Sequence, residues 1–334
     1  MKIDLVYLWV DGSDEKWLAK KNAVLKSLGR MPANHAIANK RWTDHYELLY
    51  SLRSAEKFAP WLNHIFIVTD NQMPKWLNLN NPKITIIDHK EIIPNEFLPL
   101  FNSRAIEYWL HKIPNLSEYF LYSNDDMFFG KPVEPSFFFD ENKNPILIYK
   151  ESDNKKAFTN KETNKNWKKA KWNALRLVEK EFNLQYNISF RHIITPMRKS
   201  YMKDIAENFY SEIIEPTMTP FREPTNVQRI VFSMIDNAKK RNTIVLNWRV
   251  NEKRIVYDVQ KSGAFQRFFH KCLLFFAMIF GFVKYDCYDR PIMAVHFLKK
   301  YKPTTFAISA VWGKFDSRAK FLKEMFTNKS EFEK

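Results

Sequence analysis

The chain has 334 residues, of which 45% are hydrophobic and 16% aromatic, and it contains only 6 glycines. This composition excludes a disordered or low-complexity chain and predicts one large domain or two smaller ones. Lysine and arginine outnumber the acidic residues by 53 to 37, so the net charge of +16 should attract anions such as nucleic acid, anionic lipid headgroups or phosphorylated sugars.

The first 150 residues alternate strand-like and helical patterns, which predicts an α/β fold with a mostly parallel, Rossmann-like sheet flanked by helices. The expected strands are short apolar runs at 3–10, 64–70, 83–88 and 118–125. The expected helices cover 44–58, with Asp44 as a candidate N-cap, and 103–113, with Asn102 or Ser103 as the N-cap.

Later elements are expected to be less regular. A polar, Lys- and Asn-rich stretch at 151–172 indicates a solvated loop or lid. Helical patterns follow at 173–213 and 226–241, and two strand-like runs at 243–250 and 254–259 indicate a strand pair. The portion from 263 to 334 is basic and rich in phenylalanine, and we expect it to be largely helical.

The N-terminal run contains Asp4 and Asp11, whereas a secretory signal needs a longer uncharged core, so we expect a cytoplasmic protein. Cys272 and Cys287 have no metal-type spacing and indicate no disulfide framework. The apolar segment 272–283 is shorter than the roughly 20 residues of a spanning helix. It could lie against a membrane without crossing it.

Several motifs that would define other enzyme classes are missing from the sequence. The chain has no GxGxxG, GxxxxGK[ST], HExxH, GxSxG or paired CxxC motif. This argues against ordinary dinucleotide-binding, P-loop, zinc-protease and serine-hydrolase functions. It also has no RNA-recognition signature, zinc finger or basic zipper, so only its charge favours nucleic acid.

Acidic residues follow the expected strands, at Asp11, Asp70, Asp88 and the pair Asp125 and Asp126. Ligands of doubly wound folds bind at the carboxyl ends of the strands, so these carboxylates could gather along one rim. A single Asp in this position is commonly a turn former. Two adjacent carboxylates repel each other unless cations or hydrogen-bond donors neutralise them, and oxygen ligands of this kind suit Mg²⁺ or Mn²⁺.

His192 and Arg222 are further candidates for chemistry. A neutral imidazole can accept a proton at physiological pH, although a histidine beside apolar residues is often structural. A guanidinium can bind a phosphate through two hydrogen bonds, although most arginines lie on the surface. Sequence context has to decide between these readings.

Taken together, the motifs resemble the Stealth proteins, which are sugar-phosphate transferases of bacterial capsule and polysaccharide synthesis and include the lysosomal-enzyme GlcNAc-1-phosphotransferase. "IDLVYLWVDGSD" (3–14) is similar to the first conserved region. The stretch from "RWTDHYELLYSLRSAEKFAPW" at 41 through "EYFLYSNDDMFFGKPV" ending at 133 is similar to the second over its whole length.

The third and fourth regions are similar more loosely. "RHIITPMRKSYMKDI" (191–205) carries the histidine, and "FREPTNVQ" (221–228) carries the arginine. Where many relatives have an acid in the second of these elements, this chain has Asn226. In "YDCYDRP" (285–291) the usual Asn-Asp pair of the fourth region is missing, so Asp289 is a stand-in.

The resemblance implies transfer of a sugar-1-phosphate from a UDP-sugar to a hydroxyl of a glycan acceptor, with formation of a phosphodiester and release of UMP. It implies a GT-A-like core that binds the nucleotide sugar (1–150), a lid plus the second half of the catalytic domain (151–262), and a C-terminal contact segment (263–334).

The resemblance also implies roles for single residues. His192 would take the acceptor proton, Arg222 would neutralise the transferring phosphoryl group, and Asp11 would act beside them. Asp125, Asp126 and Asp289 would hold the Mg²⁺ or Mn²⁺ ion. The substrate-binding residues would be Trp9, Gly12, Asp14, Arg41, Asp44, Arg53, Asn102, Ser103, Asn124 and Asn226.

The implied partners are the UDP-sugar donor and a lipid-linked oligosaccharide or polysaccharide acceptor, with no nucleic acid. Segment 265–285 would lie on the anionic inner face of the membrane, or else form a buried helix or a contact between identical chains. Two other functions stay open: a conventional UDP-sugar glycosyltransferase that releases UDP, and a non-catalytic polyanion-binding module.

Overall fold

The computed structural model describes residues 1–151, 166–186, 188–190, 192–239, 244–247, 255–256, 298–299, 303–308 and 317–334. Its strands are β1 (Ile3–Leu8), β2 (Ile65–Thr69), β3 (Ile84–Asp88), β4 (Tyr119–Asn124), β5 (Met127–Phe129), β6 (Ile146–Glu151), β7 (Ile188–Phe190), β8 (Thr195–Arg198), β9 (Ile244–Asn247), β10 (Ile255–Val256) and β11 (Thr305–Ala307). Its α-helices are α1 (Glu15–Ser27), α2 (Asn34–Ile37), α3 (Glu47–Phe58), α4 (His89–Ile92), α5 (Ser103–Glu107), α7 (Asn166–Phe182), α8 (Lys199–Asn208), α9 (Ile230–Ala238) and α12 (Ser317–Met325).

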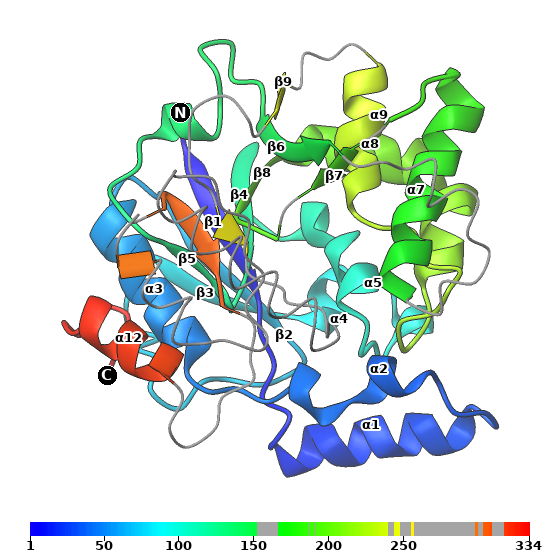
Figure 1. The fold of residues 1–334 in the computed structure, drawn as a ribbon. Helices are drawn as coiled ribbons and strands as arrows, with labels where there is room; N and C mark the ends of the chain where they lie inside the picture. The colour runs from blue at the N-terminus through cyan, green and yellow to red at the C-terminus, as the bar shows by residue number, and fades with distance from the viewer. Residues whose placement is uncertain are drawn as a thin grey trace, which may run out of the picture.

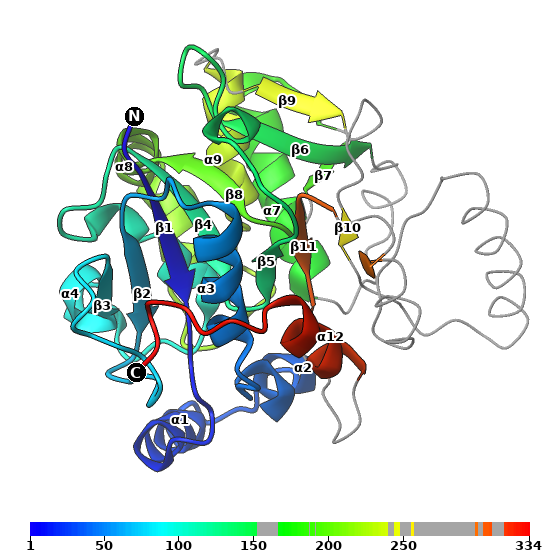
Figure 2. The ribbon, with the colours of Figure 1, turned by 90° about the vertical axis from the view of Figure 1, so that its left-hand side faces the viewer.

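A five-stranded sheet in the order β3-β2-β1-β4-β8 forms the centre of the fold (Figure 1). Strands β1 to β4 are parallel, and β8 is antiparallel to β4. The mostly parallel sheet flanked by helices confirms the predicted fold class. Helices α1 and α2 lie beyond the carboxyl ends of the parallel strands, as Figure 2 shows most clearly.

The alternation of β1 explains the two layers of the core. Val6 faces a cluster that includes residues of α5, α7, α8 and α9, whereas Leu5 and Tyr7 face a cluster that includes residues of α3. Successive side chains of a strand point to opposite faces, so β1 is buried on both sides. The first cluster also contains residues from Val6 to Ile235, so the two expected halves of the catalytic domain share one core.

Three sequence predictions need correction. The stretch 151–172 was expected to be a loop, but α7 begins at Asn166 and buries Ala170; residues 152–165 lie outside the described part of the chain. The stretch 173–213 was expected to be helical, but β7 and β8 interrupt it. Strands β9 and β10 do not pair with each other, because β9 pairs with β6 and β10 with β11. Helical spacing of apolar residues did not reveal these short strands, whose pairing is set by distant segments.

Part of the sequence lies outside the described residues. This includes Asp289 and the apolar segment 265–285, for which the expected roles stay predictions. Among the residues described, no helix is both long and apolar enough to cross a membrane.

Candidate active site

Asp125 and Asp126 form the turn between β4 and β5, at the carboxyl edge of the central sheet. Both residues are half-buried. Burial, together with repulsion from Asp126, Glu47 and Asp44, raises the pKa of Asp125 well above its ordinary value. This edge of the sheet is therefore a site of concentrated negative charge that favours either protons or a cation.

Glu47, the first residue of α3, belongs to the same acidic group and was missed by the sequence analysis. It is only 2% exposed. Its Oε2 accepts a hydrogen bond of 2.5 Å from the backbone N–H of His45, and its Oε1 has no hydrogen-bond partner among the described residues. Burial, with Asp44 and Asp126 nearby, raises its pKa to about 8. Its charged type in the otherwise apolar run "ELLYSL" was the available signal.

The sequence suggested Asp44 as the N-cap of α3, and this prediction is wrong. The N-cap is Tyr46, whose φ of 67° is left-handed, and Asp44 Oδ1 accepts from the Tyr46 N–H at 3.2 Å. The carboxylate of Asp44 thus holds the turn before α3. Burial raises its pKa, which the Trp9 indole partly opposes, so Trp9 and Asp44 lie together beside the acidic group.

His192 reaches the acidic edge from the other direction. It lies just before β8, and Thr195 of β8 is in register with Tyr122 of β4. The His192 Nε2 atom lies 3.1 Å and 3.2 Å from the two carboxylate oxygens of Asp126. Burial would lower the pKa of His192, but the Asp126 carboxylate outweighs it, and the pKa is raised. The structure therefore brings two predicted site residues into direct contact.

Three arginines lie near Tyr122 and the acidic edge. Arg222 Nη2 donates to Ser103 Oγ at 2.5 Å, which joins two residues predicted from sequence. Arg229 Nε lies 3.3 Å from Glu107 Oε2. Burial and repulsion from Arg222 lower the pKa of Arg104 to about 9. Arg104 and Arg229 were not predicted.

Tyr122 links the acidic and basic sides. Its hydroxyl lies 2.6 Å from Asn124 Oδ1 and 2.8 Å from Glu107 Oε1. The guanidinium of Arg229 lies 4.2 Å from the centroid of the Tyr122 ring. Asn124, which was predicted to bind substrate, is thus oriented by a buried tyrosine directly before the Asp pair.

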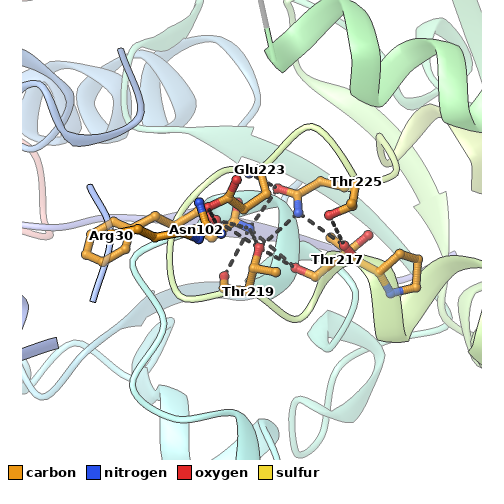
Figure 3. A network of polar contacts seen from close by, with 9 residues as sticks. Arg30, Asn102, Thr217, Thr219, Glu223 and Thr225 are labelled. Atoms are coloured by element: carbon orange, nitrogen blue, oxygen red, sulfur yellow. Dashed lines mark hydrogen bonds and ion pairs between the residues drawn. The ribbon is translucent and has the colours of Figure 1, made fainter. Parts of the chain in front are cut away.

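Asn102 and Asn226 fix the loop that carries Arg222. Figure 3 shows the network of polar contacts that joins Asn102 to Thr219 and its neighbours. Asn102 caps α5, as predicted, and its Nδ2 donates to Asn226 Oδ1 at 3.0 Å. Asn226 Oδ1 also accepts from the Glu223 N–H, and its Nδ2 donates to Thr219 Oγ1 at 2.9 Å. Both side chains are fully buried. Their hydrogen bonds to the protein position Arg222 and Ser103; their predicted contact with substrate stays a prediction.

The loop after β1 is also held by local bonds. Asp11 Oδ1 accepts from the N–H and hydroxyl of Ser13 at 2.8 Å and 2.6 Å. Asp14 caps α1 by accepting from the Trp17 N–H at 2.7 Å. Gly12 donates its N–H to the Trp42 carbonyl, and a Cβ there would lie 2.5 Å from that oxygen. A side chain at position 12 would therefore displace Trp42.

The remaining predicted residues lie elsewhere. Arg53 forms a two-pronged ion pair with Glu333, with N to O distances of 2.8 Å and 2.6 Å, and also bonds the Phe326 carbonyl. Arg41 is an exposed residue of the short 3-10 helix Asn39–Arg41. Asp70 pairs with Lys20 at 2.7 Å and Asp88 caps α4, so these two rim carboxylates have structural partners.

The described protein groups could supply only some of the ligands that a divalent cation needs. Among the described residues, no three His, Cys, Asp or Glu side chains lie close enough to hold one ion. Asp125 and Asp126 supply two carboxylates, and Mg²⁺ commonly binds one or two carboxylates together with substrate phosphates. Repulsion among the carboxyl groups raises the pKa of Asp125, and Glu47 Oε1 has no hydrogen-bond partner among the described residues, so a bound cation would stabilise this edge. The residues present therefore fit such an ion bound together with a phosphate.

Comparisons with known proteins show which sequences this chain resembles. The model of Stealth conserved region 1 matches residues 1–29, and that of Stealth conserved region 2 matches residues 41–147. A capsular polysaccharide phosphotransferase of Haemophilus influenzae is 41% identical over 232 residues, which is 69% of this chain and 63% of the relative. One from Actinobacillus pleuropneumoniae is 39% identical over 66% of this chain and 60% of the relative.

An exopolysaccharide phosphotransferase of Lactiplantibacillus plantarum is 42% identical over 57% of this chain and 52% of the relative. The chain thus matches only about half to three fifths of the length of these curated relatives. Among solved structures, the glycosyltransferase GlyE of Streptococcus pneumoniae overlays with a TM-score of 0.44 at 12% identity, over 98% of this chain and 61% of that chain. The chain thus contains the two conserved regions of the Stealth proteins and is similar to bacterial capsular and exopolysaccharide phosphotransferases.

Proposed function

We propose that the protein transfers a sugar-1-phosphate from a UDP-sugar to a hydroxyl of a glycan acceptor, forming a phosphodiester and releasing UMP. The observation that carries this proposal is the contact of His192 with Asp126. It supplies a base beside an acidic edge that suits a metal-bound diphosphate, and Arg222 and Arg229 lie near Tyr122 at the same edge. The names of the relatives support a phosphotransferase of capsule or exopolysaccharide synthesis.

The proton transfer is assigned to one atom of His192. With its Nε2–H donated to Asp126, the imidazole is held in the tautomer whose Nδ1 can accept a proton. The acceptor hydroxyl gives its proton to Nδ1 while its oxygen attacks the β-phosphorus. The bond from that phosphorus to the bridging oxygen breaks, and UMP leaves with the electron pair.

Charge on the phosphates is neutralised from two sides. Asp125 and Asp126 would hold the Mg²⁺ or Mn²⁺ ion, which when bound supplies positive charge to the diphosphate. Arg222, oriented by Ser103, binds the oxygens of the transferring phosphoryl group. Phosphoryl transfer depends on such positioning and electrostatics more than on covalent chemistry by the protein.

The acceptor in this proposal is a lipid-linked oligosaccharide or polysaccharide at the inner membrane face, where the net charge of +16 favours anionic lipid. The competing function is a conventional glycosyltransferase, in which the anomeric carbon is attacked and UDP leaves. Incubation with a panel of UDP-sugars and an oligosaccharide acceptor, followed by phosphorus NMR, separates the two. UMP and a phosphodiester are expected; UDP with a glycosidic product would overturn the proposal.

A further inference from the structure

Arg104 is a buried cation whose Nη1 atom lacks a partner. It is the second residue of α5, it is 5% exposed, and its Nη1 has no hydrogen-bond partner among the described residues. By contrast, Arg53 has both a carboxylate and carbonyl oxygens. Buried charges without partners are strongly unfavourable, so Arg104 requires an explanation beyond packing.

Glu107, the acidic residue that interacts electrostatically with Arg104, already has other partners. Glu107 favours the charged form of Arg104, but its Oε1 accepts from the Tyr122 hydroxyl and its Oε2 pairs with Arg229. Arg222 lies close enough to repel Arg104 and helps to lower its pKa to about 9. The site therefore places two guanidinium groups together, with an excess of positive charge.

An anion of two negative charges would complete this arrangement. Guanidinium groups bind phosphate oxygens through paired hydrogen bonds, which a single ammonium or hydroxyl does not match. A terminal phosphate is close to a dianion at neutral pH, whereas each phosphate of an intact diphosphate diester carries about one charge. The pair thus suits the phosphate of a nucleoside monophosphate.

The surroundings of Arg222 favour the nucleotide as the source of this phosphate. Phe221 stacks on Phe101 with ring centroids 5.3 Å apart, and Phe101 contacts Trp17 at 5.3 Å. Trp42 belongs to the same aromatic cluster and contacts Gly12 in the loop after β1. The arginine pair therefore adjoins the segment in which the donor is expected to bind.

We infer that Arg104 and Arg222 together form a phosphate subsite that binds the α-phosphate of the nucleotide, most tightly after it has become the free phosphate of UMP. Arg222 contacts the transferring phosphoryl group before the transfer and the α-phosphate after it, whereas Arg104 binds the α-phosphate throughout. The inference rests on the proposed function for the identity of the nucleotide. It adds a binding residue, Arg104, that was not predicted from the sequence.

Calorimetric titration of the full chain without metal tests this subsite, with UMP, inorganic phosphate and uridine as probes. Arg104→Met should weaken the binding of UMP and phosphate about 10-fold or more and leave uridine binding unchanged. Arg104→Lys, which keeps the charge but loses the planar fork, should give an intermediate loss. Arg176→Met, which removes an exposed arginine from α7, is the matched control and should bind like the wild type.

The unfolding temperature without ligand separates binding from a structural role. Removal of an unpaired buried charge should leave it unchanged or raise it, whereas a structural Arg104 would give a lower temperature and weaker binding of all probes. Unchanged UMP affinity in Arg104→Met would overturn the inference, and so would a loss confined to inorganic phosphate. If the wild type releases UDP, the proposed function fails, yet these titrations still report on the subsite.

Discussion

The imidazole of His192 and the carboxylate of Asp126 lie 3.1 Å apart although 66 residues separate them in the chain. The contact joins the residue that we assign as base to the acidic edge that we assign to the cation. Both side chains are partly shielded from water: 39% of the His192 side chain and 16% of the Asp126 side chain are exposed.

The first prediction concerns the pH dependence of turnover. His192 must be neutral to accept a proton, and Asp126 raises its pKa above the ordinary 6.5. kcat/KM should therefore increase with pH through an inflection above 6.5, and Asp126→Asn should move that inflection downward. His192→Gln should reduce kcat about 10²- to 10⁴-fold while the fold is kept. The same inflection in wild type and Asp126→Asn would contradict this assignment.

The His192 pair also predicts a pH dependence of stability. A histidine whose pKa is raised on folding stabilises the protein below its unfolded pKa of about 6.5, and this contribution is lost as pH rises through the folded value. The difference in unfolding free energy between wild type and His192→Gln should therefore shrink as pH rises above 6.5. Urea unfolding across that range measures it; a difference that grows with pH would oppose the contact.

Glu47 should destabilise the fold increasingly as pH rises from mildly acidic values to about 8. Its pKa is raised from 4.5 to about 8, so the folded state holds a proton that the unfolded state releases, and stability falls as pH rises between these values. The stabilisation of Glu47→Gln relative to the wild type should be larger at pH 8 than at pH 5, by on the order of 2 kcal/mol of unfolding free energy. Urea unfolding of this variant, with the exposed Glu207→Gln as control, checks the sign.

Asp125→Asn should have opposite effects with and without metal. Removal of a carboxylate that its neighbours repel should stabilise the metal-free protein. In the wild type, Mn²⁺ at 100 times its Kd should add about 2.7 kcal/mol of stability, and this gain should disappear in the variant. Thermal unfolding with and without EDTA measures both effects. A variant that is less stable without metal, or that keeps the Mn²⁺ gain, would count against the cation site.

Asn226→Asp should impair the protein even though many relatives are expected to have an acid there. The Asn226 Nδ2 donates to the Pro216 carbonyl and to Thr219 Oγ1. A carboxylate cannot donate to the carbonyl, so we expect a loss of about 1–3 kcal/mol and a lower kcat/KM, because the Arg222 loop is displaced. Unfolding and kinetics should change together. Full stability with Asp at 226 would show that the loop tolerates an acid.

Arg53→Met should lower stability without lowering the specific activity of the folded enzyme. Its guanidinium pairs with Glu333 and the Phe326 carbonyl, which joins α3 to the C-terminal tail. Loss of these charge-assisted bonds should cost about 1–3 kcal/mol. Glu333→Gln should show a similar loss. If activity fell while stability did not, the original prediction of a donor-binding Arg53 would be restored.

The sequence predicted the central sheet and the acidic edge because both follow from local pattern. Strands β1 to β4 are apolar runs, and Asp125 and Asp126 follow one of them directly. Glu47, Arg104 and Arg229 escaped prediction because their importance comes from burial and from neighbours far away in the chain. Arg53 was predicted to bind substrate, but it pairs with Glu333, a partner 280 positions away that only the fold could reveal.

The antiparallel direction of β8 has a consequence for how the two halves of the site are coupled. A parallel strand would deliver its preceding loop to the far edge of the sheet, whereas β8 starts where β4 ends. The proposed base is thus tethered to the proposed metal-binding turn by a single strand ladder and only a few residues. If the proposed function holds, lengthening the segment between His192 and Thr195 should uncouple proton removal from donor binding, leaving a protein that binds the nucleotide sugar but rarely transfers from it.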